Sequence, residues 1–339
     1  MVASARVAHL ARRGEDYGVA TGPVAVEMEE VRRRKRTLVE SWSSGSRKRL
    51  EGTGGFVGLE FGQMFRRFGS RVSILEQAPH LAPREDPDVC RAIHEILEED
   101  GIQLHLQVRA TSVASAGEGI RIRIKKEGEG GAGEAEGSLE GSHLLVAAGR
   151  VPNTDVLNLG AVGLEVEENG SILVNDRLET GVPGIWALGD VNGGPPFTHV
   201  SYDDFRIVRD NLLKGKKASR SGRLLPYTLF IDPELGRVGL TETQAREAGH
   251  RVRVATLPME RVARAVERDE TRGFIKAVVD AETDRILGAA ALAPEGGELA
   301  ALFQVAMMGD LPYQTLREGL FAHPTMAESL NNLFASLED

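Results

Sequence analysis

The sequence predicts an α/β fold, followed at the carboxyl end by a separate α+β domain. Three observations lead to this prediction. A glycine turn, an amphipathic helix pattern and a short strand pattern follow one another over residues 53–76. A second strand–loop–helix pattern begins at residue 185. After residue 224, strand patterns follow closely on one another and helix patterns lie among them, which favours the α+β class for this part.

Length and composition narrow the classes of protein. A chain of 339 residues is expected to form two or three domains, each with its own core. The hydrophobic share of 41%, the charged share of 27% and the 39 glycines are typical of a globular chain with many turns. A net charge of −9 argues against a nucleic-acid partner. Neither a signal peptide nor a membrane-spanning apolar run is present, so we expect a cytoplasmic protein without a membrane partner.

The single cysteine, Cys90, limits the possible redox and metal chemistry. It has no second cysteine with which to form an internal disulfide or a thiolate metal cage. It lies in the helix pattern of residues 87–100, where a lone cysteine is usually a small packing residue. We therefore expect no metal site in this chain.

The stretch TGGFVGLEFGQMFRRFGSRVSILE, residues 53–76, has the pattern of a dinucleotide-binding βαβ unit. Gly54 and Gly55 form its turn, and Gly55 would let the backbone approach a pyrophosphate. Gly58 would let the following helix pack closely on its sheet. The N–H groups at the start of that helix would then bind the phosphates.

Glu76 follows the strand pattern 71–75, at the distance where an acid accepts the ribose hydroxyls. A 2′-phosphate would be repelled there, which favours NAD over NADP. Two features depart from the motif. Thr53 replaces its first glycine, and the polar residues 41–52 provide no buried strand before the turn. The alternative interpretation is an ordinary glycine-rich turn.

A second ligand-binding pattern lies in the middle of the chain. The apolar residues 185–188 predict a strand that ends in Gly189 and Asp190, which places a carboxylate at the carboxyl end of a strand. A helix that begins near Thr198 would point its positive end at the same crevice. Residues 142–150, SHLLVAAGR, predict another buried strand.

The rest of the chain is assigned by the same periodicities. Predicted helices cover residues 1–13, 28–43, 241–248, 297–308 and 321–337, and predicted strands cover residues 102–108, 120–125, 227–231, 252–257, 273–279 and 285–292. The basic run at 32–36 is interpreted as a solvated helix face. Residues 128–138 are interpreted as a flexible hairpin tip.

In the last helix pattern, we expect Pro324 in the first turn and His323 at the cap. Glu328 is close enough in sequence for its carboxylate to orient the imidazole of His323. The alternative is a capping histidine beside an unrelated surface glutamate.

Four segments in this order resemble the class I pyridine nucleotide-disulfide oxidoreductases, which are FAD- and NAD-binding flavoproteins. They are GGFVGLEFGQMFRRFGS, LLVAAGRVPNTD, PGIWALGDVNGG and HPTMAESLNNLF. The resemblance is strongest to the mercuric-reductase-like branch, which includes the reactive-chlorine-resistance flavoprotein, and it covers residues 53–339. It implies incomplete Rossmann-like FAD- and NAD(P)-binding domains and a C-terminal dimerisation domain. The implied parts are a remnant of the first FAD segment (1–51), the NAD-binding domain (52–147), the second FAD segment (148–222) and the dimerisation domain (223–339).

The resemblance also implies roles for individual residues in a homodimeric oxidoreductase, which passes hydride from NADH to FAD and on to a small-molecule or metal-ion acceptor. In this family pattern, NAD would be bound by Gly54, Gly55, Gly58 and Glu76, and Glu60 would lie near the nicotinamide. Gly149 would lie between both cofactors, Gly189 and Asp190 would bind the ribityl chain of FAD, and Thr198 and His199 would face the flavin pyrimidine. His323, oriented by Glu328, would act as acid and base on the partner's thiols.

Some of the family's motifs are not found in the 339 residues. They are the redox cysteine pair, the first FAD glycine motif and the strand before the NAD turn, so the sequence is interpreted as truncated and internally deleted. We therefore expect weak FAD binding and impaired disulfide chemistry. The alternatives are a non-catalytic, dimerising homologue and an incomplete gene product.

Overall fold

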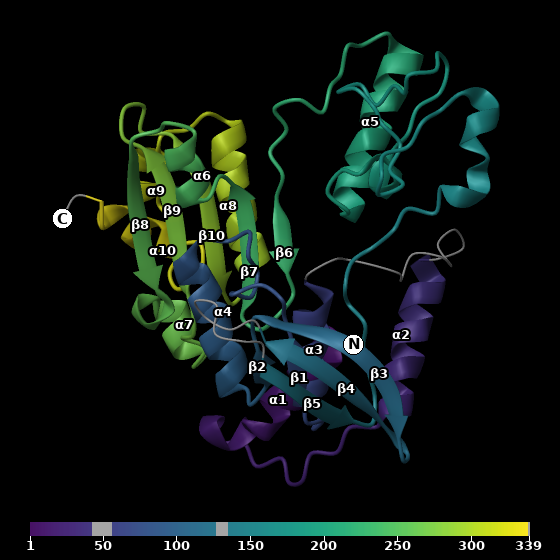
Figure 1. Cartoon of the computed structure of the whole chain (residues 1–339). Coiled ribbons are helices and arrows are strands. Elements are labelled where there is room, and N and C mark those ends of the chain that lie inside the picture. Colours follow the sequence, from purple (N-terminus) through teal and green to yellow (C-terminus); the bar gives the residue numbers. More distant parts are fainter. Residues whose placement is uncertain (43–55, 127–134, 338–339) are drawn as a thin grey trace. The chain divides into compact units, whose positions relative to one another are not determined.

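The computed structural model describes residues 1–42, 56–126 and 135–337. Its fold is mixed α/β, as the sequence predicts (Figure 1). The chain forms two compact units. Among the described residues, the first draws on residues 1–42, 56–126, 135–146 and 226–337, and the second draws on residues 147–225.

The first unit contains the helix–strand pattern of the predicted nucleotide-binding stretch. Helix α3 (Val57–Arg67) leads to strand β1 (Ser73–Leu75), and helix α4 (Pro87–Glu99) leads to strand β2 (Gln103–His105). Strands β1 and β2 pair in parallel. Both helices are amphipathic, and α4 buries one face completely through Val89, Ile93 and Leu97.

A three-stranded antiparallel sheet follows in the order β3–β4–β5. Its strands are β3 (Val108–Ala116), β4 (Gly119–Lys126) and β5 (Ala135–Gly141). The sequence predicted only β4 of these three strands. Most side chains of β3 are exposed, so the alternation of apolar and polar residues on which strand prediction rests is weak there.

The carboxyl-terminal part forms a five-stranded antiparallel sheet in the order β6–β7–β10–β9–β8. The strands are β6 (Tyr227–Leu229), β7 (Glu234–Gly239), β8 (Val252–Pro258), β9 (Phe274–Asp280) and β10 (Ile286–Ala293). The helices are α6 (Glu242–Glu247), α7 (Ala263–Glu267), α8 (Gly296–Met308), α9 (Tyr313–Arg317) and α10 (Ser329–Ala335). Helix α8 packs on β7 and β10. It comes so close at Gly236 that an added Cβ would lie 2.0 Å from the Gly296 carbonyl oxygen.

One apolar core joins the two halves of the first unit. It includes Leu59 of α3 and Ile93 of α4 together with Leu229, Leu235 and Leu292 of the five-stranded sheet. These side chains are at most 4% exposed. The hydrophobic effect therefore docks residues 56–105 on this sheet. These residues contain α3, β1, α4 and β2, and they are called the nucleotide-binding stretch after the predicted pattern.

The amino-terminal helices are α1 (Val2–Arg12) and α2 (Met28–Trp42). Helix α1 packs on α3 rather than on a sheet. Its Arg6 also reaches Asp232, at the turn between β6 and β7, with 2.9 Å between Nη1 and Oδ1. The first helix is therefore held to both halves of the first unit.

The second unit contains helix α5 (Thr198–Lys214) and three short 3₁₀ turns, η3 (Asp155–Leu157), η4 (Leu159–Val162) and η5 (Gly189–Asn192). Two strands predicted from the sequence are wrong. Residues 142–150 form no strand, and residues 185–188 contribute only an isolated bridge between Glu179 and Trp186. Val146 is 74% exposed. Continuous apolar strands of this kind are typical of parallel sheets that are buried on both faces. Within the described residues, only β1 and β2 pair in parallel.

The last helix is shorter than predicted. It begins at Ser329 with Glu328 as N-cap residue, so Pro324 and His323 precede it and do not cap it. The Thr325 hydroxyl donates to the Ala322 carbonyl and accepts from the Glu328 N–H, which makes a local turn in place of a first helical turn.

Candidate functional site

The best-formed part of the candidate nucleotide site is the edge at which β1 ends. Because β1 and β2 are parallel, their carboxyl ends meet, and the Glu76 N–H donates to the His105 carbonyl there at 2.9 Å. Glu76 Oε1 accepts from the Ala78 N–H at 2.8 Å, which fixes the carboxylate and leaves Oε2 outside that bond. Helix α3 reaches β1 through a short turn and runs back along it, so its amino end lies at the same edge.

The glycines of this turn are only partly described. Gly54 and Gly55 lie outside the described residues, while Gly58 lies in the first turn of α3 and is half-buried. The close approach of helix to strand is found at Gly62, where an added Cβ would lie 2.9 Å from the Ile74 Cδ1. Gly62 was not predicted from the sequence, although it lies one helical turn after Gly58, on the same helix face.

Glu60 contacts the five-stranded sheet. Its Oε1 accepts from the Phe230 N–H at 2.9 Å, directly after strand β6. Burial raises the pKa of Glu60, while this hydrogen bond favours the charged form. The contact ties the first turns of α3 to the five-stranded sheet.

In the second unit, Asp190 forms an ion pair with Arg150, through Oδ2 and Nη1. Asp190 is exposed, while the Nε of Arg150 is buried and has no hydrogen-bond partner. Arg150 was missed in the sequence analysis, although it directly follows Gly149. Gly149 has a φ of 113° and is exposed beside Arg150, which is consistent with a turn that requires glycine.

A buried carboxylate supports the turn before Asp190. Asp204 of α5 is 1% exposed, and its Oδ2 accepts from the Gly189 N–H at 3.0 Å. Arg223 donates to its other oxygen at 2.7 Å. Gly189 has a φ of 72°, and an added Cβ would lie 2.7 Å from the Ser201 Oγ, so only glycine fits this position.

Thr198 and His199 form the exposed first turn of α5, as the sequence predicts for the start of this helix. This turn contains no acidic side chain, and α5 has 17 residues, so the dipole of this helix favours a negatively charged or hydrogen-bond-accepting ligand at its first turn. The His199 ring stacks on Phe197, with 5.3 Å between centroids.

His323 and Glu328 are brought together, as their spacing suggested. The Nδ1 of His323 lies 2.9 Å and 2.8 Å from the two Glu328 carboxylate oxygens. A carboxylate on Nδ1 holds the proton there in neutral imidazole, which leaves Nε2 as the acceptor. The His323 side chain is 67% exposed, so Nε2 is accessible to a reacting group. Asn331 anchors α10 by donating to the Leu316 and Gly319 carbonyls.

These residues fit the two cofactors that the resemblance implies. The orphaned Nε of Arg150 can donate to a polar ligand atom beside Asp190 and the start of α5. Glu76 directly follows β1 at the carboxyl edge of the parallel pair, where a dinucleotide places its ribose. Within the described ranges, no group of three or more His, Cys, Asp or Glu side chains is arranged to hold a metal ion.

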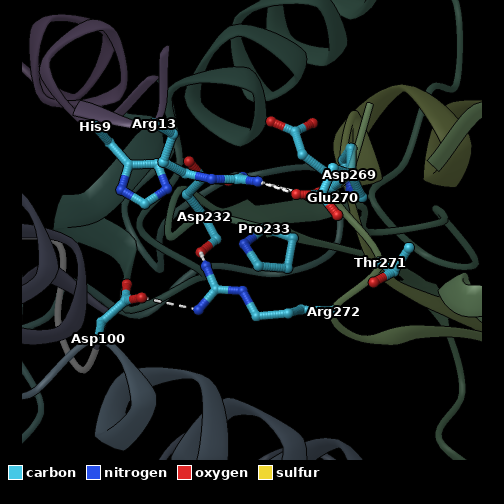
Figure 2. Close-up of a pocket in the computed structure, with 10 residues that line it drawn as sticks. His9, Arg13, Asp100, Asp232, Pro233, Asp269, Glu270, Thr271 and Arg272 are labelled. Carbon is cyan, nitrogen blue, oxygen red and sulfur yellow. Dashed lines mark hydrogen bonds and ion pairs between the residues drawn. The ribbon is translucent and has the colours of Figure 1, made fainter. Parts of the chain in front are cut away.

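A cavity of about 270 Å³ lies where α1, α4 and the five-stranded sheet meet (Figure 2). His9 lines it, and burial together with the Arg67 charge lowers the pKa of His9 to about 4. The carboxylates in its wall are already paired, for example Asp100 with Arg272 at 2.8 Å and Asp232 with Arg6 at 2.9 Å. The cavity is therefore part of a charged junction within the first unit.

The fold and these candidate sites are typical of dinucleotide-binding α/β proteins with an antiparallel carboxyl-terminal domain. The family model described as pyridine nucleotide-disulphide oxidoreductase matches residues 38–204, and the model of the dimerisation domain of the same proteins matches residues 225–334. The chain belongs to the class I pyridine nucleotide-disulfide oxidoreductase family. Members of this family are FAD-binding flavoproteins that use NAD(P)H, and the relatives are oxidoreductases.

Individual relatives agree with this assignment. The chain is 41% identical to the probable pyridine nucleotide-disulfide oxidoreductase RclA of Escherichia coli, over 83% of this chain and 62% of RclA. It is 36% identical to a mercuric reductase of Lysinibacillus sphaericus, over 84% of this chain and 51% of that protein. The structure of the HOCl-induced flavoprotein disulfide reductase RclA matches with a TM-score of 0.76, over 83% of this chain and 63% of that chain. The chain thus spans about half to three fifths of these relatives.

None of the helices in the described residues combines the length and the apolar character that crossing a membrane requires.

Proposed function

We propose that this chain is an NADH-dependent flavoprotein oxidoreductase subunit, in which hydride passes from NADH to FAD and on to a small-molecule or metal-ion acceptor. The observation that carries this proposal is the position of Glu76, fixed at the carboxyl edge of the parallel pair beside the amino end of α3. Bound FAD supplies the two-electron chemistry that connects a nicotinamide to an acceptor. A cytoplasmic location stays a prediction from composition.

The residues of this chain would act at three points. Glu76 would bind the ribose hydroxyls of NADH, with Gly55 and Gly58 at the phosphates. Asp190 and the first turn of α5, with Thr198 and His199, would hold the ribityl and pyrimidine end of FAD. At the third point, His323 would hold and move a proton at Nε2 while Glu328 keeps the proton on Nδ1.

His323 would act on a group of a partner subunit in a homodimer. This part of the proposal is supported by the match of residues 225–334 to the dimerisation domain of the family. The exposure of the imidazole supports it as well, because His323 has no reacting thiol of its own chain beside it: Cys90 is buried, with its Sγ on the Ala82 carbonyl.

A second candidate function is that of a dimerising homologue without catalysis. One observation favours it: residues 142–150 and 185–188 do not form the strands on which a flavin segment would rest. This state would bind FAD weakly and would transfer no electrons from NADH.

Cofactor and activity measurements on the purified 339-residue chain distinguish the two functions. The first predicts a flavin absorbance band after incubation with FAD, saturable NADH binding, and NADH oxidation with a disulfide, quinone or metal-ion acceptor. The second predicts a colourless chain and no NADH oxidation with any of these acceptors. The variant Asp190→Asn should weaken FAD binding if Asp190 holds the flavin, while Asp155→Asn, in the same unit, should leave it unchanged.

A further inference from the structure

Glu85 lies at the contact between the nucleotide-binding stretch and the five-stranded sheet. It stands near the end of the loop that connects Glu76 to α4, and its side chain is 1% exposed. The Tyr227 hydroxyl of β6 donates to its Oε1. Arg237 of β7, whose side chain is 3% exposed, lies on its other side.

The pairing of Glu85 with Arg237 is incomplete. The Arg237 Nε lies 3.7 Å from the Glu85 Oε2, which is too long for a hydrogen bond. Both Oε2 and the Arg237 Nη2 are buried without a hydrogen-bond partner. A buried carboxylate is costly when its lone pairs accept no hydrogen bond, and protonation removes most of that cost.

The carboxylates close to Glu85 also disfavour its ionised form. Asp86 and Asp88 follow it in the chain, and Glu242 of α6 lies beyond them, while Lys276 of β9 contacts all three of these carboxylates at 2.7–3.3 Å. The thiol of Cys90, on α4, donates to the backbone carbonyl of Glu85 at 3.6 Å. Burial first, and then Asp86 and Asp88, raise the pKa of Glu85 to about 7 although Arg237 opposes them.

We propose that Glu85 is a protonation-dependent latch that sets how tightly the nucleotide-binding stretch is docked on the sheet of the dimerisation domain. Protonated Glu85 fits its buried position and keeps the contact closed. Ionised Glu85 gains by moving into water, so the contact opens more often. The latch does not depend on FAD or NADH, so it stands apart from the redox function proposed above.

The direction of the pH effect follows from the two protonation states. When the contact opens, Glu85 meets water and returns to a pKa near the ordinary glutamate value of about 4.3. The docked state therefore binds the proton more tightly than the open state. Docking is strongest below about pH 4.3, weakens as the pH rises towards 7, and is constant above that.

Four backbone N–H groups report on this contact directly. Those of Phe230 and Asp232 donate to Glu60 and Gln63 of α3. Those of Glu242 and Thr243 donate to Asp86, next to Glu85. All four lose their acceptors when the contact opens, so their exchange with deuterium measures the opening equilibrium.

The test is hydrogen–deuterium exchange of the full chain between about pH 5 and 9, followed in peptides that cover residues 227–243. Each rate is divided by the intrinsic rate at that pH. The opening equilibrium should rise by up to about tenfold per pH unit below pH 7 and then level off. The variant Glu85→Gln, which resembles the protonated state, should lack this rise and keep the low opening constant at pH 8.

A second variant keeps the test decisive if Glu85→Gln does not fold. Tyr227→Phe removes a donor to the charged form of Glu85, so the pH at which opening levels off should move upward. An equal pH dependence in Glu85→Gln and the parent chain would overturn the latch. So would an unchanged or lower levelling-off pH in Tyr227→Phe.

Discussion

The charged junction around Asp232 provides the sharpest test of how the first unit is held together (Figure 2). The Asp232 carboxylate pairs with Arg67 of α3, through Oδ2 and Nη1, and with Arg6 of α1 at 2.9 Å. Its backbone carbonyl accepts from Gln63 at 2.9 Å and from Arg272 at 3.1 Å. The substitution Asp232→Asn removes the charge and leaves these backbone contacts in place.

The magnitude follows from the burial of the partners. The Arg67 side chain is only 6% exposed, and breaking a buried pair by removing one partner costs about 3–5 kcal/mol. Arg67 keeps a weaker contact with Asp100 at 3.4 Å, and the amide oxygen that the substitution introduces still accepts one hydrogen bond, so part of this cost is recovered. The Arg6 side chain is 32% exposed, and its pair adds at most about 1 kcal/mol. We expect Asp232→Asn to lower the free energy of unfolding by about 2–4 kcal/mol at pH 7.

The pH dependence supplies a second and independent measure. Burial of Asp232 opposes its ionisation, but Arg67 and Arg6 outweigh burial and lower its pKa. The stabilisation is therefore complete above the ordinary aspartate pKa of about 3.9 and is lost as the pH falls through the lower pKa of the folded chain. The difference between the parent chain and Asp232→Asn should shrink in that acid range.

Urea unfolding followed by circular dichroism at neutral and acid pH measures both effects. The control is Asp16→Asn, because Asp16 is 53% exposed and pairs with Arg13 at the surface, where a change below about 0.5 kcal/mol is expected. A loss of less than about 1 kcal/mol for Asp232→Asn at pH 7, or a loss that does not depend on pH, would refute the reasoning.

Three further predictions concern packing, cofactor choice and assembly. Gly236→Ala places a Cβ 2.0 Å from a backbone oxygen of α8, so thermal unfolding should show a loss of about 3 kcal/mol or more, while Gly160→Ala, with open space around it, should be neutral. In titrations with NADH and NADPH, the parent chain should bind NADH more tightly by about 1–3 kcal/mol of binding free energy, and Glu76→Ala should reduce this difference. Equal affinities of the parent chain for the two cofactors would contradict the role of Glu76. Sedimentation should show that the parent chain is a dimer at micromolar concentration, and a monomer would disprove the predicted dimerisation. The variant Leu320→Asp should weaken the dimer, because Leu320 is a fully exposed apolar side chain of the dimerisation domain.

Local sequence patterns were sufficient for the elements that depend on their own periodicity. Helix α4 was predicted to within a residue because its apolar side chains repeat at helical spacing, Pro87 opens it and Gly101 follows it. The pair of His323 and Glu328 was predicted because five residues of chain suffice to bring both groups together. The family, too, followed from motifs that are contiguous in sequence.

Other features depend on contacts between distant segments. Strand β7 was not predicted, since Gly236 and the buried Arg237 interrupt its apolar pattern. Gly236 is needed because α8 packs against it, and Arg237 is buried beside Glu85, so both residues are explained only by distant segments. Arg150 and Asp190 are 40 residues apart, and only the fold joins them. Residues 142–150 are apolar enough for a buried strand, yet they form none. A strand also needs neighbouring strands that hydrogen-bond to its backbone, and those neighbours come from other parts of the chain.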